Sequence, residues 1–170
     1  MYGNDLLLKY SKCLFMNVFI LNVFSGKDTI KFLQGLCTND LNNFNEECKA
    51  AAFLTPKGRI MTGALLYKHS RADNASVLVE THCQHSTALV AYLKQFKLRS
   101  KVTINAVPEL QCHILDDNED PANWKSLNPN CILVSADPRF PGAKKRAIVS
   151  DNGNCYYYLN TSTYAFNRFH

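Results

Sequence analysis

The chain has 170 residues, of which 46% are hydrophobic and 19% are charged. A chain of this length buries roughly 70% of its unfolded surface, and its composition excludes both wholesale disorder and a membrane-spanning bundle. The formal net charge is +5, and the seven cysteines include no C-x-x-C pair, so free thiols in a reducing compartment are predicted rather than a disulfide framework.

The first predicted elements are strands. Residues 13–24 form an apolar segment that follows Lys9 and Lys12. This segment is too short to span a bilayer, contains Asn17 and Asn22, and precedes no small-x-small cleavage site, so it does not fit a signal-peptide core. We expect one or two buried strands here.

Two short helices are expected next. The turn at 25–28 offers an N-terminal cap, and the first helix should end at Gly35, because glycine is common just past helix ends. A second short helix is predicted over 39–44, with one of the polar residues at 38–40 as its cap.

A hairpin and a third strand follow. Strands are predicted over 50–54 and 59–68, joined by the T-P-K-G turn at 55–58, because proline and glycine favour a tight bend. Residues 76–80 are rich in valine and predict a third strand.

The clearest amphipathic helix spans 83–97 and precedes a strand over 101–107. Its apolar stripe should lie on the sheet. The stripe consists of His85, Ala88, Leu89, Tyr92, Leu93 and Phe96.

Beyond Pro108 the pattern changes to short strands separated by an acidic loop and by turns, one of them the D-N-G-N hairpin turn at 151–154. The strands are predicted over 110–115, 131–135, 146–149 and 155–159.

The order of these elements predicts an α+β fold, with antiparallel sheets and helices packed on one sheet face. We expect one α+β unit over 28–107. A second antiparallel unit is expected from 1–27 together with 108–170.

The turn at 55–58 is the first candidate binding site. Lys57 and Arg59 lie close together there and suit a carboxylate or a phosphate, because arginine offers a bidentate fork and lysine a point charge. A solvated hairpin tip explains the same two residues, and spacing alone favours that alternative.

The stretch F-L-Q-G-L-C-T-N-D at 32–40 is the second candidate. Gln34 and Asn39 can exchange hydrogen bonds with a heterocycle, and Cys37 is a candidate metal ligand or nucleophile. Helix capping and core packing explain the same residues.

Two further clusters contain residue types that can carry chemistry. His82 and His85 share a helix face, but no further ligand stands at a recognisable spacing, so a structural role is predicted. Lys94, Arg99 and their basic neighbours at 97 and 101 suit an anionic ligand or partner or, equally, a solvated helix end.

Several classes of function lack their motifs. No P-loop, G-x-G-x-x-G, G-x-S-x-G or H-E-x-x-H is present, and the basic stretch lacks the interleaved aromatics of a nucleic-acid surface. We therefore assign no catalytic residue and no metal ligand, and we predict neither nucleic-acid binding nor membrane insertion.

The stretch at 32–40, followed by L-T-P-K-G-R-I at 54–60, resembles the YgfZ/GcvT-like family of folate-binding proteins. Within that family it is similar to the branch of mitochondrial iron-sulfur cluster assembly factors. V-E-T at 79–81, D-P-R at 137–139 and Y-x-x-x-R at 164–168 look like further segments of this branch.

The resemblance implies an aminomethyltransferase-like (GcvT/YgfZ) folate-binding fold, in which three domains surround a central pocket for tetrahydrofolate. This chain would supply roughly the first two domains, with the C-terminal part of the family fold missing. It implies a ligand-binding pocket formed by Gln34, Thr38, Asn39, Asp40, Lys57, Arg59 and Arg139.

The chain departs from the family pattern at two places. The signature K-G-C-[FY]-x-G-Q-E, linked to cluster assembly, is absent and would lie beyond His170, so the chain is either truncated or has lost that function. The related aminomethyltransferases carry an aspartate pair where this chain has Thr62, Gly63 and Ala64. No carboxylate stands there to act on a folate.

These features lead to the hypothesis of a non-enzymatic, folate-binding-type accessory factor for maturation of [4Fe-4S] proteins in the mitochondrial matrix. Its expected partners are iron-sulfur cluster assembly proteins of the A-type scaffold or carrier class, and a cluster would be reached only through the missing segment. The alternatives are a folate-dependent aminomethyltransferase of the glycine cleavage type and an interaction module that keeps only the fold.

Overall fold

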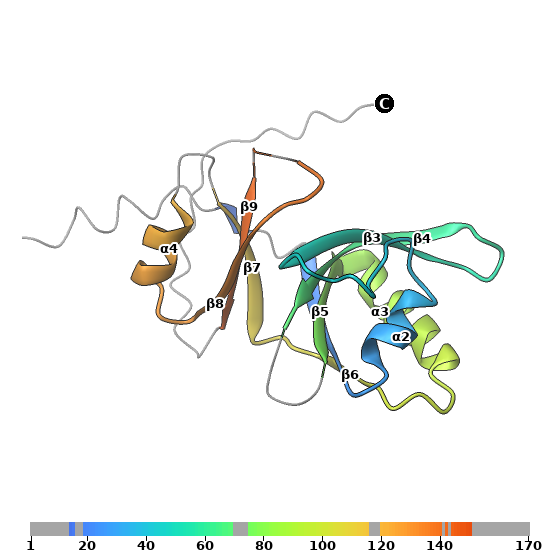
Figure 1. The fold of residues 1–170 in the computed structure, drawn as a ribbon. Helices are drawn as coiled ribbons and strands as arrows, with labels where there is room; N and C mark the ends of the chain where they lie inside the picture. The colour runs from blue at the N-terminus through green and yellow to red at the C-terminus, as the bar shows by residue number, and fades with distance from the viewer. Residues whose placement is uncertain are drawn as a thin grey trace, which may run out of the picture.

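The computed structural model describes residues 14–15, 19–69, 75–115, 120–140, 142 and 144–150. Over these ranges the chain forms two antiparallel sheets accompanied by helices (Figure 1). The predicted hairpin turn at 151–154, the predicted strand at 155–159 and the segment 164–168 lie outside the described residues.

The larger sheet has five strands in the order β3-β4-β5-β2-β6, and each neighbouring pair is antiparallel. Three of these strands overlap the ranges predicted from the hairpin turn and from the valine-rich pattern, and the other two overlap the predicted ranges 13–24 and 101–107. The strands are β2 Phe19–Ser25, β3 Cys48–Leu54, β4 Ile60–Lys68, β5 Ser76–His82 and β6 Thr103–Ala106.

The smaller sheet has four strands in the order β1-β7-β9-β8, again with antiparallel neighbours. Its strands are β1 Leu14–Phe15, β7 Leu110–Leu115, β8 Cys131–Ala136 and β9 Lys145–Ser150.

Strand β2 belongs to the larger sheet, although its residues were predicted to join the second antiparallel unit. The sequence analysis grouped residues 1–27 with 108–170, yet β2 pairs with β5 and β6 inside the larger sheet, while β1 pairs with β7 in the smaller one. The N-terminal apolar segment is therefore divided between the sheets. An apolar pattern shows that a strand is buried but not which neighbours it pairs with.

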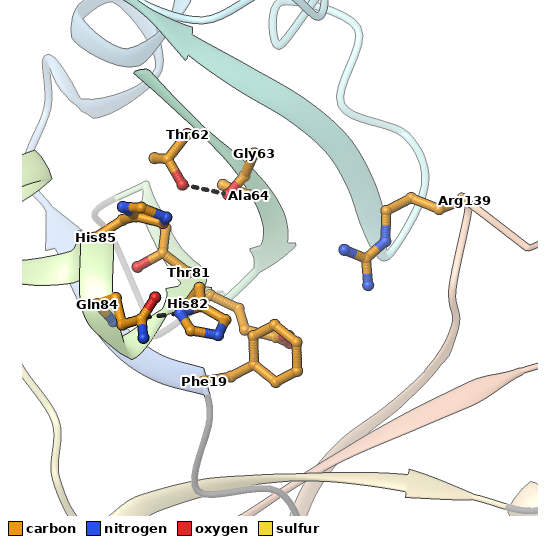
Figure 2. A pocket seen from close by; sticks show the side chains of 10 residues that line it. Phe19, Thr62, Gly63, Ala64, Thr81, His82, Gln84, His85 and Arg139 are labelled. Atoms are coloured by element: carbon orange, nitrogen blue, oxygen red, sulfur yellow. Dashed lines mark hydrogen bonds between the residues drawn. The ribbon is translucent and has the colours of Figure 1, made fainter. Parts of the chain in front are cut away.

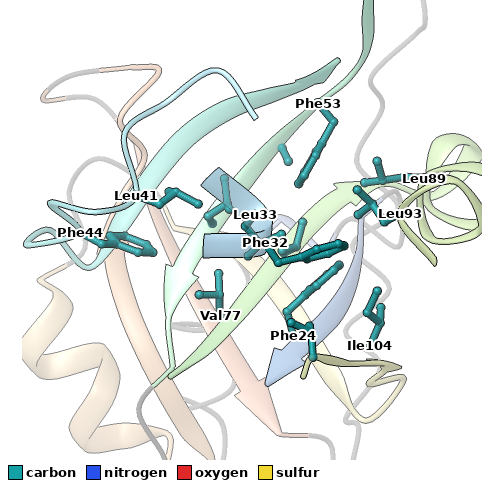
Figure 3. Packing of buried hydrophobic residues seen from close by; sticks show 14 residues of the cluster. Phe24, Phe32, Leu33, Leu41, Phe44, Phe53, Val77, Leu89, Leu93 and Ile104 are labelled. Atoms are coloured by element: carbon teal, nitrogen blue, oxygen red, sulfur yellow. The ribbon is translucent and has the colours of Figure 1, made fainter. Parts of the chain in front are cut away.

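Helices α2 (Thr29–Gln34) and α3 (Cys83–Phe96) pack on one face of the larger sheet, as the sequence predicts. Between them and the sheet lies the main hydrophobic core, built around Phe24, Phe53 and Leu93 (Figure 3). The predicted α+β fold with helices on one sheet face is confirmed.

The buried face of α3 is rotated slightly from the predicted stripe. Leu89 and Leu93 are buried as expected, but His85 and Ala88 are exposed. Ser86 is buried instead, where its hydroxyl accepts a hydrogen bond of 3.0 Å from the Asn22 amide. A buried polar pair fixes the rotation of the helix, which a stripe of apolar residues alone does not show.

The other face of the larger sheet packs against the smaller sheet. Side chains on β5 alternate, so Val77 and Val79 face the helices while Leu78 joins a second core with Ile148 of β9. Helix α4 (Pro121–Leu127) buries Trp124 against the outer face of the smaller sheet. The result is four layers, with α2 and α3 at one end and α4 at the other (Figure 1).

Helix α4 forms without having been predicted from the sequence, and the helix predicted over 39–44 does not form. Asp120 caps α4 by accepting a hydrogen bond of 3.0 Å from the Ala122 N–H, and Pro121 takes the first helical position. Residues 39–44 form no helix, because their polar groups bond to neighbouring backbone instead.

Gly26 begins the turn between β2 and α2 and is held at φ +135°. A Cβ atom at this position would lie 2.1 Å from the carbonyl oxygen of Lys101. The carboxylate of Asp28 accepts a hydrogen bond of 2.7 Å from the Lys101 N–H. This bond connects the turn to the segment that precedes β6.

We expect Gly26→Ala to lower the free energy of unfolding by clearly more than Gly58→Ala. Gly58 has φ +73°, and a methyl group at its Cα would meet nothing within 4 Å, so its substitution should cost only the left-handed backbone term of about 1–2 kcal/mol. Gly26→Ala adds the clash with Lys101. Urea unfolding of the two variants measures the difference, and equal losses would contradict this account.

Candidate functional site

The stretch at 32–40 covers the outer edge of β3. The Thr38 N–H donates to the Ala52 carbonyl at 3.0 Å, and the Thr38 hydroxyl accepts from the Ala52 N–H at 2.9 Å. The Asn39 amide donates to the Ala50 carbonyl at 2.8 Å. These bonds satisfy backbone groups that an edge strand otherwise leaves open to pairing with another chain.

Gln34 and Asp40 complete the same loop. The Gln34 amide donates to the Asn39 carbonyl at 3.3 Å and accepts from the Leu41 N–H at 2.5 Å. The Asp40 carboxylate accepts from the Asn42 N–H at 2.9 Å. The side chains predicted as a pocket wall therefore make hydrogen bonds that hold this loop in place.

Cys37 lies inside this loop with a half-buried thiol. The thiol donates to the Asn39 carbonyl at 3.5 Å. Burial raises the pKa of the thiol above its ordinary value, and the backbone of Asn39 offsets only part of this shift. The thiol is therefore protonated near neutral pH, a state that disfavours a nucleophile.

Lys57 and Arg59 stand at the exposed tip of the hairpin between β3 and β4. The tip is held by backbone bonds, in which Gly58 N–H donates to the Thr55 carbonyl at 2.9 Å and Thr55 N–H donates to the Arg59 carbonyl at 2.8 Å. Neither cation is within salt-bridge distance of a carboxylate of the described residues.

A pocket of about 340 Å³ lies where β4 runs past the end of β5. Strands β2, β4 and β5, the start of α3 and Arg139 enclose it (Figure 2). Its lining residues are Phe19, Thr62, Gly63, Ala64, Glu80, Thr81, His82, Gln84, His85 and Arg139.

The pocket wall combines a polar group and aromatic rings. The Thr81 hydroxyl is buried and has no hydrogen-bond partner in the described part of the chain, so it can bond to a ligand or to water. The rings of Phe19 and His82 meet edge to face at 6.1 Å, and Figure 2 shows Arg139 on the opposite side of the pocket. Such a wall suits a flat, polar ring with an acidic substituent.

Of the residues predicted as a site, Arg139 lines this pocket and the other six do not. Gln34, Thr38, Asn39 and Asp40 bond to β3 and its loop, and Lys57 and Arg59 lie at the hairpin tip; their role in ligand binding stays a prediction. Thr81 was not singled out from the sequence, and His82 was given a structural role there. The step from a valine-rich strand directly into a helix marks the place where both residues stand.

A buried ionic network joins the two sheets beside the pocket. Arg146 on β9, 4% exposed, pairs with the Glu80 carboxylate on β5 and donates at 2.8 Å to the carboxylate of Asp137. Its guanidinium also lies over the ring of Phe19, 4.9 Å from the ring centre. One side chain thus contacts residues from both sheets and from the pocket wall.

Asp137 connects this network to the pocket, because it bonds both to Arg146 and to the pocket residue Arg139. Arg139 makes two bonds to the Asp137 carboxylate, of 2.9 and 2.7 Å. Burial alone would raise the pKa of Asp137, but the hydrogen bonds from Arg139 and Arg146 outweigh burial and hold the pKa well below its usual range. The carboxylate is therefore ionised and fixes the position of Arg139.

Glu80 is the carboxylate nearest to the pocket, and its acceptor positions are occupied. The Tyr67 hydroxyl donates to Glu80 at 2.5 Å, and the Cys112 thiol donates at 3.2 Å. Burial and the charge of Glu80 together raise the pKa values of Tyr67 and Cys112, so both groups stay protonated and keep these bonds.

The described residues contain neither a metal-ligand cluster nor a helix that could cross a membrane. The described ranges contain no cluster of three or more histidine, cysteine or acidic residues able to hold a metal ion, and the rings of His82 and His85 are 5.8 Å apart. No helix among the described residues has the length and apolarity required to cross a membrane.

Comparison with known proteins gives matches in sequence, although no family model matches the chain. The iron-sulfur cluster assembly factor IBA57 homolog, mitochondrial, of Neurospora crassa is 29% identical over 142 residues, and that of Aspergillus clavatus is 32% identical over 152 residues. These matches cover 76% and 73% of this chain but 32% and 34% of the relatives. The chain thus spans about a third of their length.

A solved structure matches the fold. The glycine cleavage system aminomethyltransferase T from Bartonella henselae superposes with a TM-score of 0.65, over 82% of this chain and 42% of that one. At 11% sequence identity the likeness shows the fold alone, and it confirms the fold that the motifs imply.

We expect Arg146→Met to lower the free energy of unfolding by about 3–5 kcal/mol, because it leaves Glu80 without its cation in the interior. Arg139→Met is the matched control. Its side chain is 37% exposed and its removal leaves Asp137 paired with Arg146, so a loss of about 1 kcal/mol or less is expected. Chemical denaturation measures both, and similar losses would show that the network does not carry the contact between the sheets.

Proposed function

Because the chain belongs to the GcvT-like family, in the branch of the mitochondrial iron-sulfur cluster assembly factors, we propose that it is an accessory factor for the maturation of mitochondrial [4Fe-4S] proteins. The matched relatives are about three times as long as the matched part. The proposal therefore concerns the contribution of these two sheets to such a factor.

The residues that line the pocket support a non-enzymatic role. Thr62, Gly63 and Ala64 occupy the place that the family resemblance assigns to the aspartate pair of the aminomethyltransferases, and they line the pocket. Glu80 also lines it, but its carboxylate is bound to Arg146, Tyr67 and Cys112. A group so engaged is poorly placed to exchange protons with a ligand.

The pocket suits one end of a reduced folate. Its volume of about 340 Å³ falls within the range of ligand pockets, the free Thr81 hydroxyl can bond to a heterocycle, and Phe19 and His82 offer ring surfaces. Arg139 would hold a carboxylate. A bound folate would supply a carrier of one-carbon groups.

The remaining parts of the proposal concern surroundings and partners. In the mitochondrial matrix, the expected partners are iron-sulfur cluster assembly proteins of the A-type scaffold or carrier class. Lys57 and Arg59 at the hairpin tip are exposed cations free to meet an anionic ligand or partner. Gln34, Thr38, Asn39 and Asp40 would act on the ligand indirectly, by holding the loop beside β3.

Calorimetric titration of the chain with tetrahydrofolate tests the pocket. We expect binding heat for the unmodified chain and at least about a tenfold loss of affinity for Gly63→Val, because a side chain at Gly63 meets nothing within 4 Å and would occupy the space beside the pocket wall. Thr103→Val, on an exposed position of β6, is the matched control. A folded chain that gives no heat would remove the folate from the proposal.

Depletion of the full-length protein from cells tests the role in cluster assembly. We expect the activities of mitochondrial [4Fe-4S] enzymes to fall several-fold and to recover on re-expression, while [2Fe-2S] proteins keep their clusters. Enzyme assays and cluster spectroscopy on isolated mitochondria give the measurement. Unchanged [4Fe-4S] enzymes after depletion would overturn the proposed function.

A further inference from the structure

A groove of about 730 Å³ lies at the far end of α3 from the pocket. Helix α3 has 14 residues and begins at the pocket, so the two places are about 20 Å apart along the helix axis, at 1.5 Å per residue. We call this surface the basic groove; it is lined by Asp28, Lys31, Phe32, Leu98, Arg99 and Ser100.

The basic groove brings together cations from two separate segments. The turn between β2 and α2 meets the segment after α3, because the Lys101 N–H donates to Asp28 at 2.7 Å. Residues 26–31 and 94–101 carry six cations against one carboxylate, Asp28, and two of the six, Lys31 and Arg99, line the groove itself. None of the six is in a salt bridge among the residues that the structure describes. They are Lys27, Lys31, Lys94, Lys97, Arg99 and Lys101.

Leu98 is the unusual residue of the groove. Its side chain is 88% exposed, and its backbone φ of +40° is in the left-handed region. A leucine in that conformation is disfavoured where glycine or asparagine would be accepted. The exposed side chain contributes little to the core, so the position loses backbone stability without gaining burial. An apolar contact outside the chain would account for a leucine there.

The shape and composition of the groove indicate its occupant. Two apolar side chains, Phe32 and Leu98, line the groove together with two cations, Lys31 and Arg99. A concave surface suits an inserted chain segment better than it suits the flat surface of a bilayer. Cations beside apolar side chains complement acidic residues next to an apolar side chain.

We propose that the basic groove binds an acidic segment of a partner protein, with an apolar side chain of that segment placed between Leu98 and Phe32. Lys31 and Arg99 pair with the carboxylates of the segment. This interaction is independent of the folate pocket, because the residues that line the two places are different.

The test titrates the isotope-labelled chain with a short synthetic peptide in which aspartates and glutamates flank a pair of leucines, and follows amide shifts by NMR. We expect the shifts to concentrate at Lys31 and at 98–101 and to weaken with added salt. Lys31→Glu with Arg99→Glu should lower the affinity about tenfold or more. The matched control, Lys68→Glu with Lys125→Glu, makes the same charge change at exposed positions of β4 and α4 outside the groove and should leave the affinity close to that of the unmodified chain.

Leu98→Asn separates binding from folding. Asparagine tolerates the left-handed conformation, so the melting temperature should stay the same or rise while the peptide affinity falls several-fold. A peptide in which serines replace the leucines should bind correspondingly weakly.

Three outcomes would overturn the proposal. The first is chemical shift changes located away from the groove. The second is an equal loss of affinity in the control with Lys68 and Lys125 changed, which would indicate attraction by net charge alone. The third is groove-dependent binding to vesicles of phosphatidylcholine with cardiolipin when the peptide does not bind, which would indicate a lipid surface instead.

Discussion

The buried pairing of Arg146 with Glu80 is the interaction on which the arrangement of the two sheets depends. Each carboxylate and the guanidinium would be costly to bury alone, and each is compensated because the sheets meet face to face. The apolar contacts around them, including Leu78 against Ile148, favour burial in general. Apolar packing tolerates several relative positions of the two sheets. The ion pair forms only in the position that places Glu80 of β5 next to Arg146 of β9.

The same network connects the packing of the sheets to the pocket. Asp137 bonds to Arg146 on one side and to Arg139 on the other, so the cation at the mouth of the pocket is fixed by a contact made in the interior. The ring of Phe19 lies under the guanidinium of Arg146 and also lines the pocket. A ligand site with these walls is thus pre-organised by the core, and the carboxylate that lines it, Glu80, is bonded to Arg146, Tyr67 and Cys112.

The polar stretch at 32–40 shows how a family motif can be structural. Thr38 and Asn39 supply the edge of β3 with hydrogen bonds that a further strand would otherwise make. These bonds occupy backbone groups of Ala50 and Ala52 on the β3 edge, while the hairpin tip with Lys57 and Arg59 stays exposed. Cys37 takes part in this cover of β3, because its backbone forms an antiparallel bridge with Phe53.

The sequence by itself determined the elements with strong local signals. The hairpin of β3 and β4, the valine-rich β5 and the amphipathic α3 follow from turn chemistry and periodicity, and the motifs identified the family. Only the tertiary structure decided that β2 joins the larger sheet, that residues 34–40 bond to β3, and that Glu80 meets Arg146 across 66 positions of sequence. Hydrophobic periodicity shows which face of a helix or strand is buried. It does not show which residues, distant in the sequence, pack against that face.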